Sequence, residues 1–507
     1  MSEQLDHVTF SPDIDAFRNI YAAGKSQIVW HWMSSDLETP VSTYLKICGH
    51  SPYAFLLESV EGGATLGRYS IIGTQPDLLW RCSKGAVEVS DANGQWVKQD
   101  VDARESLSAI ISQSSVDVTP DDLPPMCALG MFGYIGYDMI RIVEDIPDNN
   151  PDDLGVPDSV LMRPSLLVIF DNVKNTMCFA TPVYSHANNS DISAEAAYNA
   201  AHGRLDKALR AVHAPLDRAL VECKTALSGD QAPISNTPEA DYKDAVRKAV
   251  DYIVSGEIFQ VVPSQRFSVD FDLPSFELYR SLRSVNPSPF LFHLAFDGFA
   301  LVGSSPEILV RVRDDVVTIR PIAGTRRRGA TSAEDKALAE ELLSDPKERS
   351  EHLMLLDLGR NDVGRVAKIG SVNVTEEFQV ELYSHVMHIV SNVEGHLRDD
   401  VDIVDALFAG FPAGTVSGAP KIRAMEIIDE LEVSRRGTYA GGVGYFSKHA
   451  MDSCIALRTA LVKDNKVYVQ AGGGVVADSD PDFEHQECCN KAKAVLHAAN
   501  LTIQKFT

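Results

Sequence analysis

Two segments of the sequence place pairs of glutamates at helical spacing directly after an Asp-Pro step, at residues 345–346 and 480–481. Such steps are typical of helix starts, because aspartate accepts hydrogen bonds from the free amides of the first turn and proline is tolerated there. Glutamates three residues apart then lie on one face of each helix. The four glutamates are Glu348 and Glu351 on the first helix and Glu484 and Glu487 on the second. Each pair alone would be an ordinary solvated face that complements the helix dipole, but together they offer the oxygen ligands that Mg²⁺ accepts.

A loop and a glycine run between and beyond these helix starts could present backbone amides to an anion. Residues 411–421 are rich in glycine, proline and hydroxyl side chains and could expose Thr415 to a ligand. The glycine run follows an expected strand at residues 467–470, and glycine lets backbone N–H groups approach an anion closely. A tight turn would explain the same run without a ligand. Its members are Gly472, Gly473 and Gly474.

Two basic side chains stand in apolar surroundings. His388 lies in an expected strand, residues 386–390, that is apolar on both faces, where a histidine is usually a buried core residue. Arg458 ends another apolar run, residues 455–458, which we expect to be a strand. Because a buried arginine needs a carboxylate partner, we expect an acidic group beside Arg458.

Several catalytic motifs are absent from the sequence. Gly24-Lys25-Ser26 imitates the end of a phosphate-binding loop, but Asn19 stands where that motif needs its first glycine. There is no H-E-x-x-H, no G-x-S-x-G and no G-x-G-x-x-G that opens a helix after a strand. No cysteine stands in the glycine-containing elbow of a glutamine-hydrolysing enzyme, so ammonia from glutamine would have to be released by another chain.

The composition is that of an acidic globular protein. The 507 residues include 71 acidic and 46 basic side chains, which gives a formal net charge of −25. A charge of this sign opposes binding to nucleic acid or to a membrane, and the sequence has no basic patch that would offset it. We find neither a secretory signal at the N-terminus nor an apolar stretch long enough to span a bilayer. The eight cysteines form no clustered framework, which favours a reducing cytoplasm.

The first half of the chain reads as mostly β structure. Short apolar runs separated by glycine and proline predict strands within residues 44–97. Helical periodicity follows at residues 193–212, and residues 226–239 have the composition of a linker. We therefore divide the chain into an N-terminal region, residues 1–236, and a second region, residues 237–507.

The second region alternates between helical and strand patterns, which predicts an α+β fold. The expected helices are residues 239–255, 276–285, 333–357 and 481 onward. The expected strands lie within residues 258–271, 290–294, 300–302, 316–320, 386–393 and 441–446.

Four stretches in this order carry a specific resemblance, namely residues 321–326, 345–362, 411–421 and 470–491. They resemble the chorismate-utilising enzymes, and within them the large (component I) subunits of anthranilate synthases, and the likeness runs through almost the whole chain. The resemblance implies an α+β fold in which large antiparallel β-sheets form a layered sandwich flanked by helices. It also implies that residues 1–236 are regulatory and that residues 237–507 bind chorismate and carry the catalytic site.

The resemblance implies that the four glutamates hold one Mg²⁺, which grips the ring carboxylate of chorismate. Glu351 and Glu487 would be direct ligands, whereas Glu348 and Glu484 would act directly or through water. An anionic substrate in an acidic protein needs such a cation to reverse the local potential.

The same resemblance implies the residues that hold the rest of the substrate. Lys491 and Arg458 would add positive charge, and Tyr439 and Arg458 would anchor the enolpyruvyl carboxylate. The remaining members of the cradle would be Thr415, Gly324, Thr325 and the amides of Gly472, Gly473 and Gly474.

Two residues match the acid and the eliminating residue of the family. Glu307 would protonate the departing C4 hydroxyl while ammonia attacks C2, with Thr415 and Lys491 among the catalytic residues around it. His388 would take part in the loss of a ring proton and pyruvate from the resulting aminodeoxyisochorismate. The product would be anthranilate.

Two positions discriminate among the sister enzymes of this family. Aminodeoxychorismate synthases typically have a nucleophilic lysine where Ala323 stands, and isochorismate and salicylate synthases have a basic lysine where Gln260 stands. Neither alanine nor glutamine can serve these roles, so ammonia remains as the nucleophile.

The first half also resembles the family's tryptophan feedback site. Phe290 and Leu291 depart from the tyrosine and methionine that are common there, and an ordinary strand and turn would explain the same segments. The matching residues are Leu57, Glu58, Ser59, Pro289, Phe290 and Leu291.

Together these expectations describe a cytoplasmic, Mg²⁺-dependent lyase in the first committed step of tryptophan biosynthesis, inhibited by tryptophan. A separate glutamine amidotransferase subunit would release ammonia from glutamine, which implies a hetero-oligomer. Two alternatives stay open: an aminodeoxychorismate synthase component I, against which Ala323 argues, and a catalytically inactive binding protein for chorismate or tryptophan. The retained acidic ligands, Glu307, His388 and Lys491 argue against the second.

Overall fold

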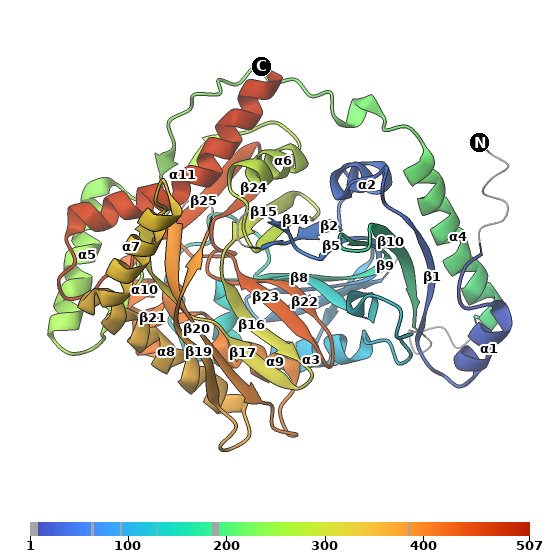
Figure 1. Ribbon diagram of the computed structural model, residues 1–507, viewed down its shortest axis with the longest axis horizontal. Coiled ribbons are helices and arrows are strands. Elements are labelled where there is room, and N and C mark those ends of the chain that lie inside the picture. Colours follow the sequence, from blue (N-terminus) through green and yellow to red (C-terminus); the bar gives the residue numbers. More distant parts are fainter. Residues whose placement is uncertain (1–8, 62–64, 92–93, 129, 185–191, 384–385) are drawn as a thin grey trace.

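A computed structural model describes residues 9–61, 65–91, 94–128, 130–184, 192–383 and 386–507 (Figure 1). Most of the strands in these residues form one antiparallel sheet of 21 strands. Those before residue 236 are β1 (Gln27–Ser34), β2 (Ala54–Glu58), β5 (Tyr69–Ser83), β6 (Ala86–Asp91), β7 (Trp96–Gln99), β8 (Met131–Ile135), β9 (Ser159–Asp171), β10 (Thr176–Val183) and β11 (Ile234–Ser235). Those after it are β13 (Ser264–Asp270), β14 (Phe290–Ala295), β15 (Phe299–Ser305), β16 (Ile308–Arg313), β17 (Val316–Ile319), β18 (Ile322–Arg327), β19 (Asn373–Leu382), β20 (Val386–His396), β22 (Gly442–Phe446), β23 (Met451–Ile455), β24 (Thr459–Lys463) and β25 (Lys466–Gly472).

Two small sheets and a set of helices complete the described structure. The small sheets pair β3 (Val60–Glu61) with β4 (Thr65–Leu66) and β12 (Gln260–Val261) with β21 (Gly418–Ala419). The α-helices are α1 (Ile14–Ala22), α2 (Pro40–Ile47), α3 (Ala103–Gln113), α4 (Ala194–His213), α5 (Glu239–Val254), α6 (Ser275–Val285), α7 (Ser332–Ser344), α8 (Pro346–Val366), α9 (Ile403–Gly410), α10 (Lys421–Leu431) and α11 (Pro481–Phe506). The short 3₁₀ helices are η1 (Pro125–Ala128), η2 (Tyr137–Ile142), η3 (Arg218–Leu220) and η4 (Gly414–Val416).

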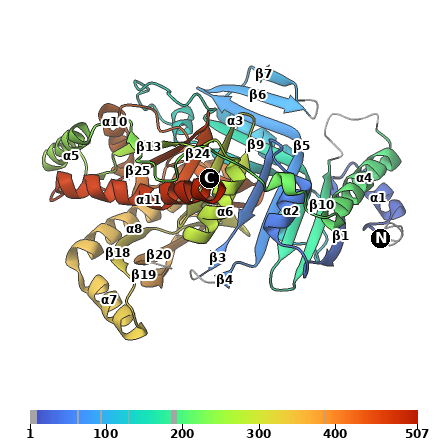
Figure 2. The same cartoon turned by 90° about the horizontal axis from the view of Figure 1, so that it is seen from above.

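Two groups of helices lie at opposite ends of the folded sheet. In both views α5, α7, α8, α10 and α11 lie at one end, and α1 and α4 lie at the other (Figure 2). At the first end, α8 packs on β18 and β20, and α11 packs on β25. The first turns of α8 and α11 therefore lie beside strand ends.

Strands from both sides of residue 236 pair within the large sheet. In β2, Leu57 is opposite Phe292 of β14, and in β8, Phe132 is opposite Tyr445 of β22. The two sequence regions thus share one sheet, and the division of their roles at residue 236 stays a prediction.

The expected α+β class, with large antiparallel sheets flanked by helices, is confirmed. Three local predictions are wrong. The helix expected over residues 333–357 is two helices, because Asp345 is extended (ψ 114°) and Pro346 starts a new first turn. Tyr44, the first residue of the segment expected to be β, lies in α2. Arg458 lies in the turn between β23 and β24 with φ +48°, and not in a strand.

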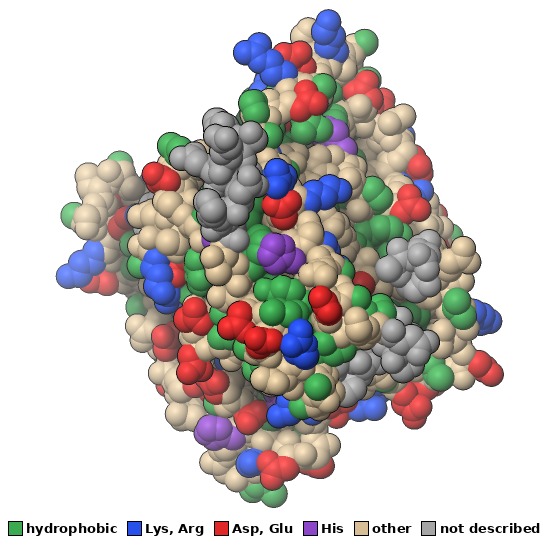
Figure 3. All heavy atoms as spheres, turned by 90° about the vertical axis from the view of Figure 1, so that its right-hand side faces the viewer, with side chains coloured by type: hydrophobic (Ala, Val, Ile, Leu, Met, Phe, Trp, Pro, Cys, Tyr) green, Lys and Arg blue, Asp and Glu red, His purple; other side chains and the backbone are tan. Residues whose placement is uncertain are grey.

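The surface carries both signs of charge. On the face drawn in Figure 3, lysine and arginine side chains are interspersed with aspartate and glutamate. Within the described residues, no helix combines the length and the apolar character needed to cross a bilayer. The seven cysteines whose side chains the structure describes are free thiols.

Candidate active site

The first turn of α8 holds one pair of the predicted glutamates, and its start is capped as expected. Asp345 Oδ1 accepts hydrogen bonds from the backbone amides of Lys347 (2.9 Å) and Glu348 (3.4 Å). The Glu348 carboxylate also accepts a 2.8 Å hydrogen bond from Arg326 Nη1, at the end of β18. The sequence prediction missed this ion pair, although Arg326 follows directly after the predicted substrate residue Thr325. Arg326 begins a run of three arginines, and the sequence gives no sign of which of them pairs with Glu348.

The second pair lies in the first turns of α11. Asp480 Oδ1 accepts from the Phe483 amide at 2.9 Å, as the predicted cap requires. Glu484 Oε1 accepts a 2.7 Å hydrogen bond from the Ser479 hydroxyl, and its Oε2 is buried without a hydrogen-bond partner in the described residues. Glu487 forms a 2.7 Å ion pair with Lys491, one turn further along the helix.

The two helix starts face each other closely enough for their charges to interact. Burial raises the pKa of Glu351, and the charges of Glu348 and Glu487 raise it further, while Lys491 and Lys347 oppose the shift. Burial also raises the pKa of Glu484, and Glu487 adds to this shift. Carboxylates from both helices therefore repel one another across one space.

The four glutamates have the ligand chemistry that a divalent cation requires, but their carboxylates are not yet spaced to coordinate one. In the described residues, no three acidic, histidine or cysteine side chains are already spaced to hold a metal ion. The unpartnered buried oxygen of Glu484 and the repulsion felt by Glu351 are the features that an oxygen-liganded cation would relieve. Arg326 and Lys491 neutralise Glu348 and Glu487 in the structure as it stands.

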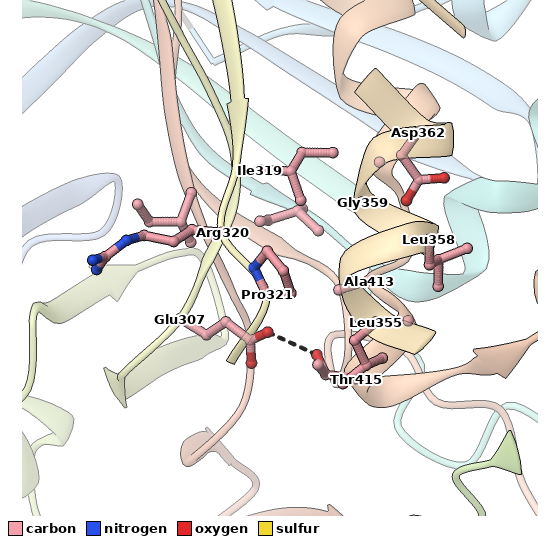
Figure 4. Close-up of a pocket in the computed structure, with 14 residues that line it drawn as sticks. Glu307, Ile319, Arg320, Pro321, Leu355, Leu358, Gly359, Asp362, Ala413 and Thr415 are labelled. Carbon is pink, nitrogen blue, oxygen red and sulfur yellow. Dashed lines mark hydrogen bonds between the residues drawn. The ribbon is translucent and has the colours of Figure 1, made fainter. Parts of the chain in front are cut away.

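Glu307 lies in the bend between β15 and β16 and is 7% exposed. The Thr415 hydroxyl donates a 2.9 Å hydrogen bond to its Oε1 (Figure 4). Burial raises the pKa of Glu307 to about 8, although Thr415, Arg458 and Lys491 oppose the shift. The side chain is therefore a neutral carboxylic acid at pH 7, which is the form that can donate a proton.

His388 sits on β20 opposite Thr325 of β18. Its Nδ1 lies 3.0 Å from the Gly324 carbonyl oxygen and 3.1 Å from the Thr325 hydroxyl oxygen. A carbonyl can only accept, so we assign the ring proton to Nδ1, which leaves Nε2 with a free lone pair. Burial lowers the pKa of His388 to about 4, and the nearby Arg458 and Lys491 lower it as well, so the ring is neutral at pH 7.

Glycines at the end of β25 bring its backbone close to its neighbours. A Cβ on Gly472 would lie 2.7 Å from the Pro263 carbonyl oxygen, and one on Gly473 would lie 2.9 Å from Glu484 Oε2. A side chain at either position would therefore collide with backbone or with a predicted metal ligand. Lys491 Nζ donates a 3.0 Å hydrogen bond to the Gly472 carbonyl, which ties α11 to this strand end.

Arg458 and Tyr439 complete the predicted substrate residues. Within the described part of the chain, the Arg458 guanidinium makes no ion pair, so the expected carboxylate partner is not found in contact with it. Burial lowers the pKa of Arg458, and the charges of Tyr383 and Glu307 partly restore it. Tyr439 is buried and lies beneath the guanidinium of Arg436, 5.4 Å from the ring centre. Arg458 is thus a partly buried cation whose charge is available to an anionic ligand.

These contacts gather the predicted catalytic residues into one site. Gly324 joins His388 through its carbonyl, and a Cβ on it would lie 3.0 Å from Glu348 Oε2. The charges of Arg458 and Lys491 act on both Glu307 and His388. A neutral acid, a neutral base and two cations thus lie beside the converging glutamates.

The residues of the predicted tryptophan site lie together elsewhere. A cavity of 1480 Å³ is bordered by Leu57, Glu58, Ser59, Pro289, Phe290 and Leu291. Within it, the Glu58 carboxylate is already bound by Arg283 at 2.7 and 3.1 Å and by the Tyr279 hydroxyl. Glu58 therefore links the wall of this cavity to α6, and both of its carboxylate oxygens already accept hydrogen bonds from that helix.

The chain is similar to proteins of known activity over nearly its full length. The chorismate binding enzyme family matches residues 55–497. The chain is 54% identical over 495 residues to the anthranilate synthase component 1 of Cereibacter sphaeroides, covering 96% of this chain and 97% of that protein. It is 46% identical over 481 residues to the anthranilate synthase component 1 of Pseudomonas putida, covering 93% of this chain and 94% of that protein.

Solved structures agree with these sequence relatives. Anthranilate synthase component I from Streptococcus pneumoniae TIGR4 aligns with a TM-score of 0.73 and 37% identity, covering 92% of this chain and 99% of that chain. MenF, the menaquinone-specific isochorismate synthase from Escherichia coli, aligns with a TM-score of 0.67 and 19% identity, covering 96% and 99%, and shares the fold. With the motifs, the site and these relatives in agreement, the chain belongs to the anthranilate synthase component I group of the chorismate binding enzyme family.

Proposed function

We propose that the protein is the large subunit of an anthranilate synthase, a lyase that converts chorismate and ammonia into anthranilate and pyruvate. The observation that carries this proposal is Glu307, a buried carboxyl whose pKa of about 8 keeps it protonated at neutral pH. Beside it, His388 is a neutral imidazole. The site thus offers an acid for one step and a base for the next.

The first step needs the acid. Ammonia attacks C2 of the chorismate ring, the C4 hydroxyl departs, and the Glu307 carboxyl gives that hydroxyl a proton so that it leaves as water. The Thr415 hydroxyl orients the carboxyl through its 2.9 Å hydrogen bond. The ammonia nitrogen loses a proton as it becomes the amine of aminodeoxyisochorismate, so protons balance over the step.

The second step needs a base. Aminodeoxyisochorismate becomes aromatic when a base removes the ring proton at C2 and the C3–O bond breaks, and the departing enolpyruvate takes up a proton to become pyruvate. With Nδ1 held by the Gly324 carbonyl, His388 Nε2 is the free nitrogen that could accept this proton. The low pKa of His388 keeps that lone pair available at neutral pH.

The nucleophile is inferred from two side chains. Ala323 is buried in β18, and Gln260 is buried in β12 beside Gly474. Neither side chain can attack C2 or deprotonate water, unlike a lysine at the same position. Ammonia is therefore the nucleophile of this proposal, and aminodeoxychorismate, isochorismate and salicylate are not its products.

Chorismate carries two carboxylates, and the site has separate positive charge for each. Arg458 and Tyr439 would hold the enolpyruvyl carboxylate, and Lys491 would contribute to the field around the ring. The glutamates of α8 and α11 would hold Mg²⁺, with Glu351 and Glu487 as its direct ligands. When bound, Mg²⁺ supplies the charge that attracts and orients the ring carboxylate.

We also propose that tryptophan inhibits the enzyme from the 1480 Å³ cavity that Ser59 and Pro289 border. The volume is larger than an indole requires, and its walls combine apolar side chains with charged ones such as Arg311 and Asp452. Feedback by tryptophan would suit the first committed step of tryptophan synthesis.

Ammonia would reach the site from a partner chain. The sequence lacks the cysteine elbow of a glutaminase, and the relatives are named component 1, which implies that they work with a second component. We infer a hetero-oligomer with a separate glutamine amidotransferase subunit, working in the cytoplasm. Ammonium salts at alkaline pH should replace that partner in vitro.

The test is a fluorescence assay of the purified chain with chorismate, Mg²⁺ and an ammonium salt, with and without tryptophan. Anthranilate formed without a partner and suppressed by tryptophan would support the reaction and its regulation together. Ligand binding without turnover would contradict the enzyme proposal.

A further inference from the structure

A small cavity lies where three of the four stretches that carry the family resemblance meet. Its volume is 20 Å³, and its walls include Pro321 from the first stretch, Gly359 and Asp362 from the second, and Ala413 and Thr415 from the third, together with Glu307. A cavity of about 10–15 Å³ on this measure already holds one water molecule. The proposed function gives Gly359 and Asp362 no role.

The walls of this cavity are polar enough to hold a water. The Glu307 carboxyl and the Thr415 hydroxyl lie at one end of the group of lining side chains, and the Asp362 carboxylate lies at the other (Figure 4). Lys421 Nζ donates a 2.9 Å hydrogen bond to Asp362 Oδ2, so this buried charge is neutralised. Arg320 turns its guanidinium away toward Glu381. Most of the wall is apolar, but Glu307, Thr415 and Asp362 supply the few polar partners that a buried water needs.

Apart from Glu307 and Thr415, the described wall of the cavity contains none of the residues that the proposed function assigns to chorismate. None of the described wall residues is Gly324, His388, Arg458 or Lys491, which belong to the substrate side. Within the described residues, the Thr415 hydroxyl is the sole hydrogen-bond partner of the Glu307 carboxyl. One carboxyl oxygen thus remains for a further partner.

We propose that the cavity holds one water molecule that is hydrogen-bonded to the Glu307 carboxyl and returns a proton to it after each turnover. This inference rests on the proposed function, in which Glu307 gives its proton to the departing C4 hydroxyl. The cavity water then gives a proton to the carboxylate and takes one from solvent. The returned proton replaces the one that Glu307 gave to the hydroxyl, and it is matched by the proton that ammonia releases to solvent when it becomes an amine.

Solvent can approach the cavity through its wall. Leu358 and Ala413 border it and are themselves partly exposed. The opposite approach, through the substrate side, is closed while chorismate or product is bound. A cavity water that passes protons from solvent to Glu307, here called the relay, would therefore let this carboxylate regain its proton before the product leaves.

Gly359 allows the cavity to be filled without strain. A Cβ on Gly359 would meet its nearest atom, Ile319 Cγ2, at 3.6 Å, which is an ordinary contact. Alanine is also a better helix former than glycine, so Gly359→Ala should not destabilise α8. Gly364→Ala is a matched control, since Gly364 is exposed on the same helix and its added Cβ would meet nothing within 4 Å.

The experiment compares kcat, KM for chorismate, the solvent deuterium isotope effect and the melting temperature of the wild type and both variants. With saturating ammonium and Mg²⁺, we expect Gly359→Ala to lower kcat about tenfold or more, since a general acid that recovers slowly loses much of its contribution. The KM for chorismate should stay unchanged, and the melting temperature should not fall. The solvent deuterium isotope effect should rise, because the return of the proton to Glu307 becomes rate-limiting. Gly364→Ala should match the wild type in kcat, KM and isotope effect, and its melting temperature should likewise not fall.

Wild-type kcat in Gly359→Ala, or a lower kcat with an unchanged isotope effect, would overturn the inference while the wild type still forms anthranilate. Failure of the wild type to form anthranilate would instead overturn the proposed function. A high-resolution crystal structure of the wild type gives an independent decision. An ordered water within hydrogen-bond distance of the Glu307 carboxyl would support the relay, and a dry cavity would overturn it even if Gly359→Ala failed to fold.

Discussion

The Thr415 hydroxyl donates a 2.9 Å hydrogen bond to the Glu307 carboxyl, across 108 positions of sequence. This contact joins the bend after β15 to η4 and fixes the direction of the one buried acid assigned to catalysis. It also opposes the effect of burial, which raises the pKa of that acid to about 8. The balance of burial and hydrogen bonding thus decides the pH at which the acid can work.

Glu307→Gln should abolish most of the activity, because the amide cannot protonate the departing hydroxyl. We expect kcat to fall by roughly 10²- to 10⁴-fold, the usual contribution of a general acid. In the wild type, activity at a fixed concentration of free ammonia should fall as the pH rises through about 8, where Glu307 loses its proton. Steady-state rates from pH 6 to pH 10 measure both effects, and a Glu307→Gln enzyme with wild-type kcat would contradict the role.

The stability of the same variant separates catalysis from folding. The pKa of Glu307 is raised from 4.5 to about 8 by folding, so the folded state keeps a proton that the unfolded chain releases in this window. The corresponding stability is present below pH 4.5 and is lost as the pH rises through about 8. Glu307→Gln should remove this pH dependence and be at least as stable as the wild type at pH 8, as measured by urea unfolding.

Thr415→Val should shift the pH profile in a direction that the hydrogen bond dictates. The Thr415 hydroxyl lowers the pKa of Glu307 by stabilising the carboxylate, so its removal should raise that pKa further. The alkaline limb of the rate profile should therefore move to higher pH. A shift to lower pH would show that Thr415 does not bind this carboxyl.

Glu351→Gln and Glu487→Gln should each abolish Mg²⁺-dependent turnover and leave the fold intact. The two carboxylates come from facing helices and already repel one another, which a shared cation would reverse. A chelator should inactivate the wild type, and added Mg²⁺ should restore it. Glu340→Gln, on the exposed face of α7, is the control and should respond to Mg²⁺ as the wild type does. Near-normal activity in either ligand variant would remove the metal assignment.

Ser59→Leu should relieve inhibition by tryptophan and spare catalysis, because a larger side chain would occupy the cavity beside Pro289. Inhibition curves at fixed chorismate measure the effect, and Ser51→Leu, at an exposed position outside the cavity wall, serves as the control. Unchanged inhibition in Ser59→Leu would place the effector elsewhere.

Local features of this fold could be predicted from the sequence, because their causes are local. Asp345 and Asp480 cap their helices as expected, since a cap depends on two or three neighbouring amides. The break between α7 and α8 lies at the Asp345-Pro346 helix start that the capping motif predicted, so the expected helix over residues 333–357 was wrong because it ran across that start. The turn at Arg458 was missed because an apolar run does not reveal a residue with positive φ.

The features of the site that could not be predicted from the sequence depend on contacts between distant segments of the chain. The motifs and the family resemblance identified Glu307, Thr415, Gly324 and His388 separately, but their pairing depends on the register of β18 with β20 and on where η4 packs. The ion pair of Arg326 with Glu348 likewise depends on that packing. The small cavity behind Glu307 has no sequence signal, because its walls come from three distant stretches.

The most direct test is to identify the product formed from chorismate and ¹⁵N-labelled ammonium by the wild-type chain with Mg²⁺ and no partner. We predict anthranilate that carries one ¹⁵N, with an equal amount of pyruvate, measured by mass spectrometry and a coupled pyruvate assay. Aminodeoxychorismate, isochorismate or salicylate as the product, or unlabelled anthranilate, would contradict the account.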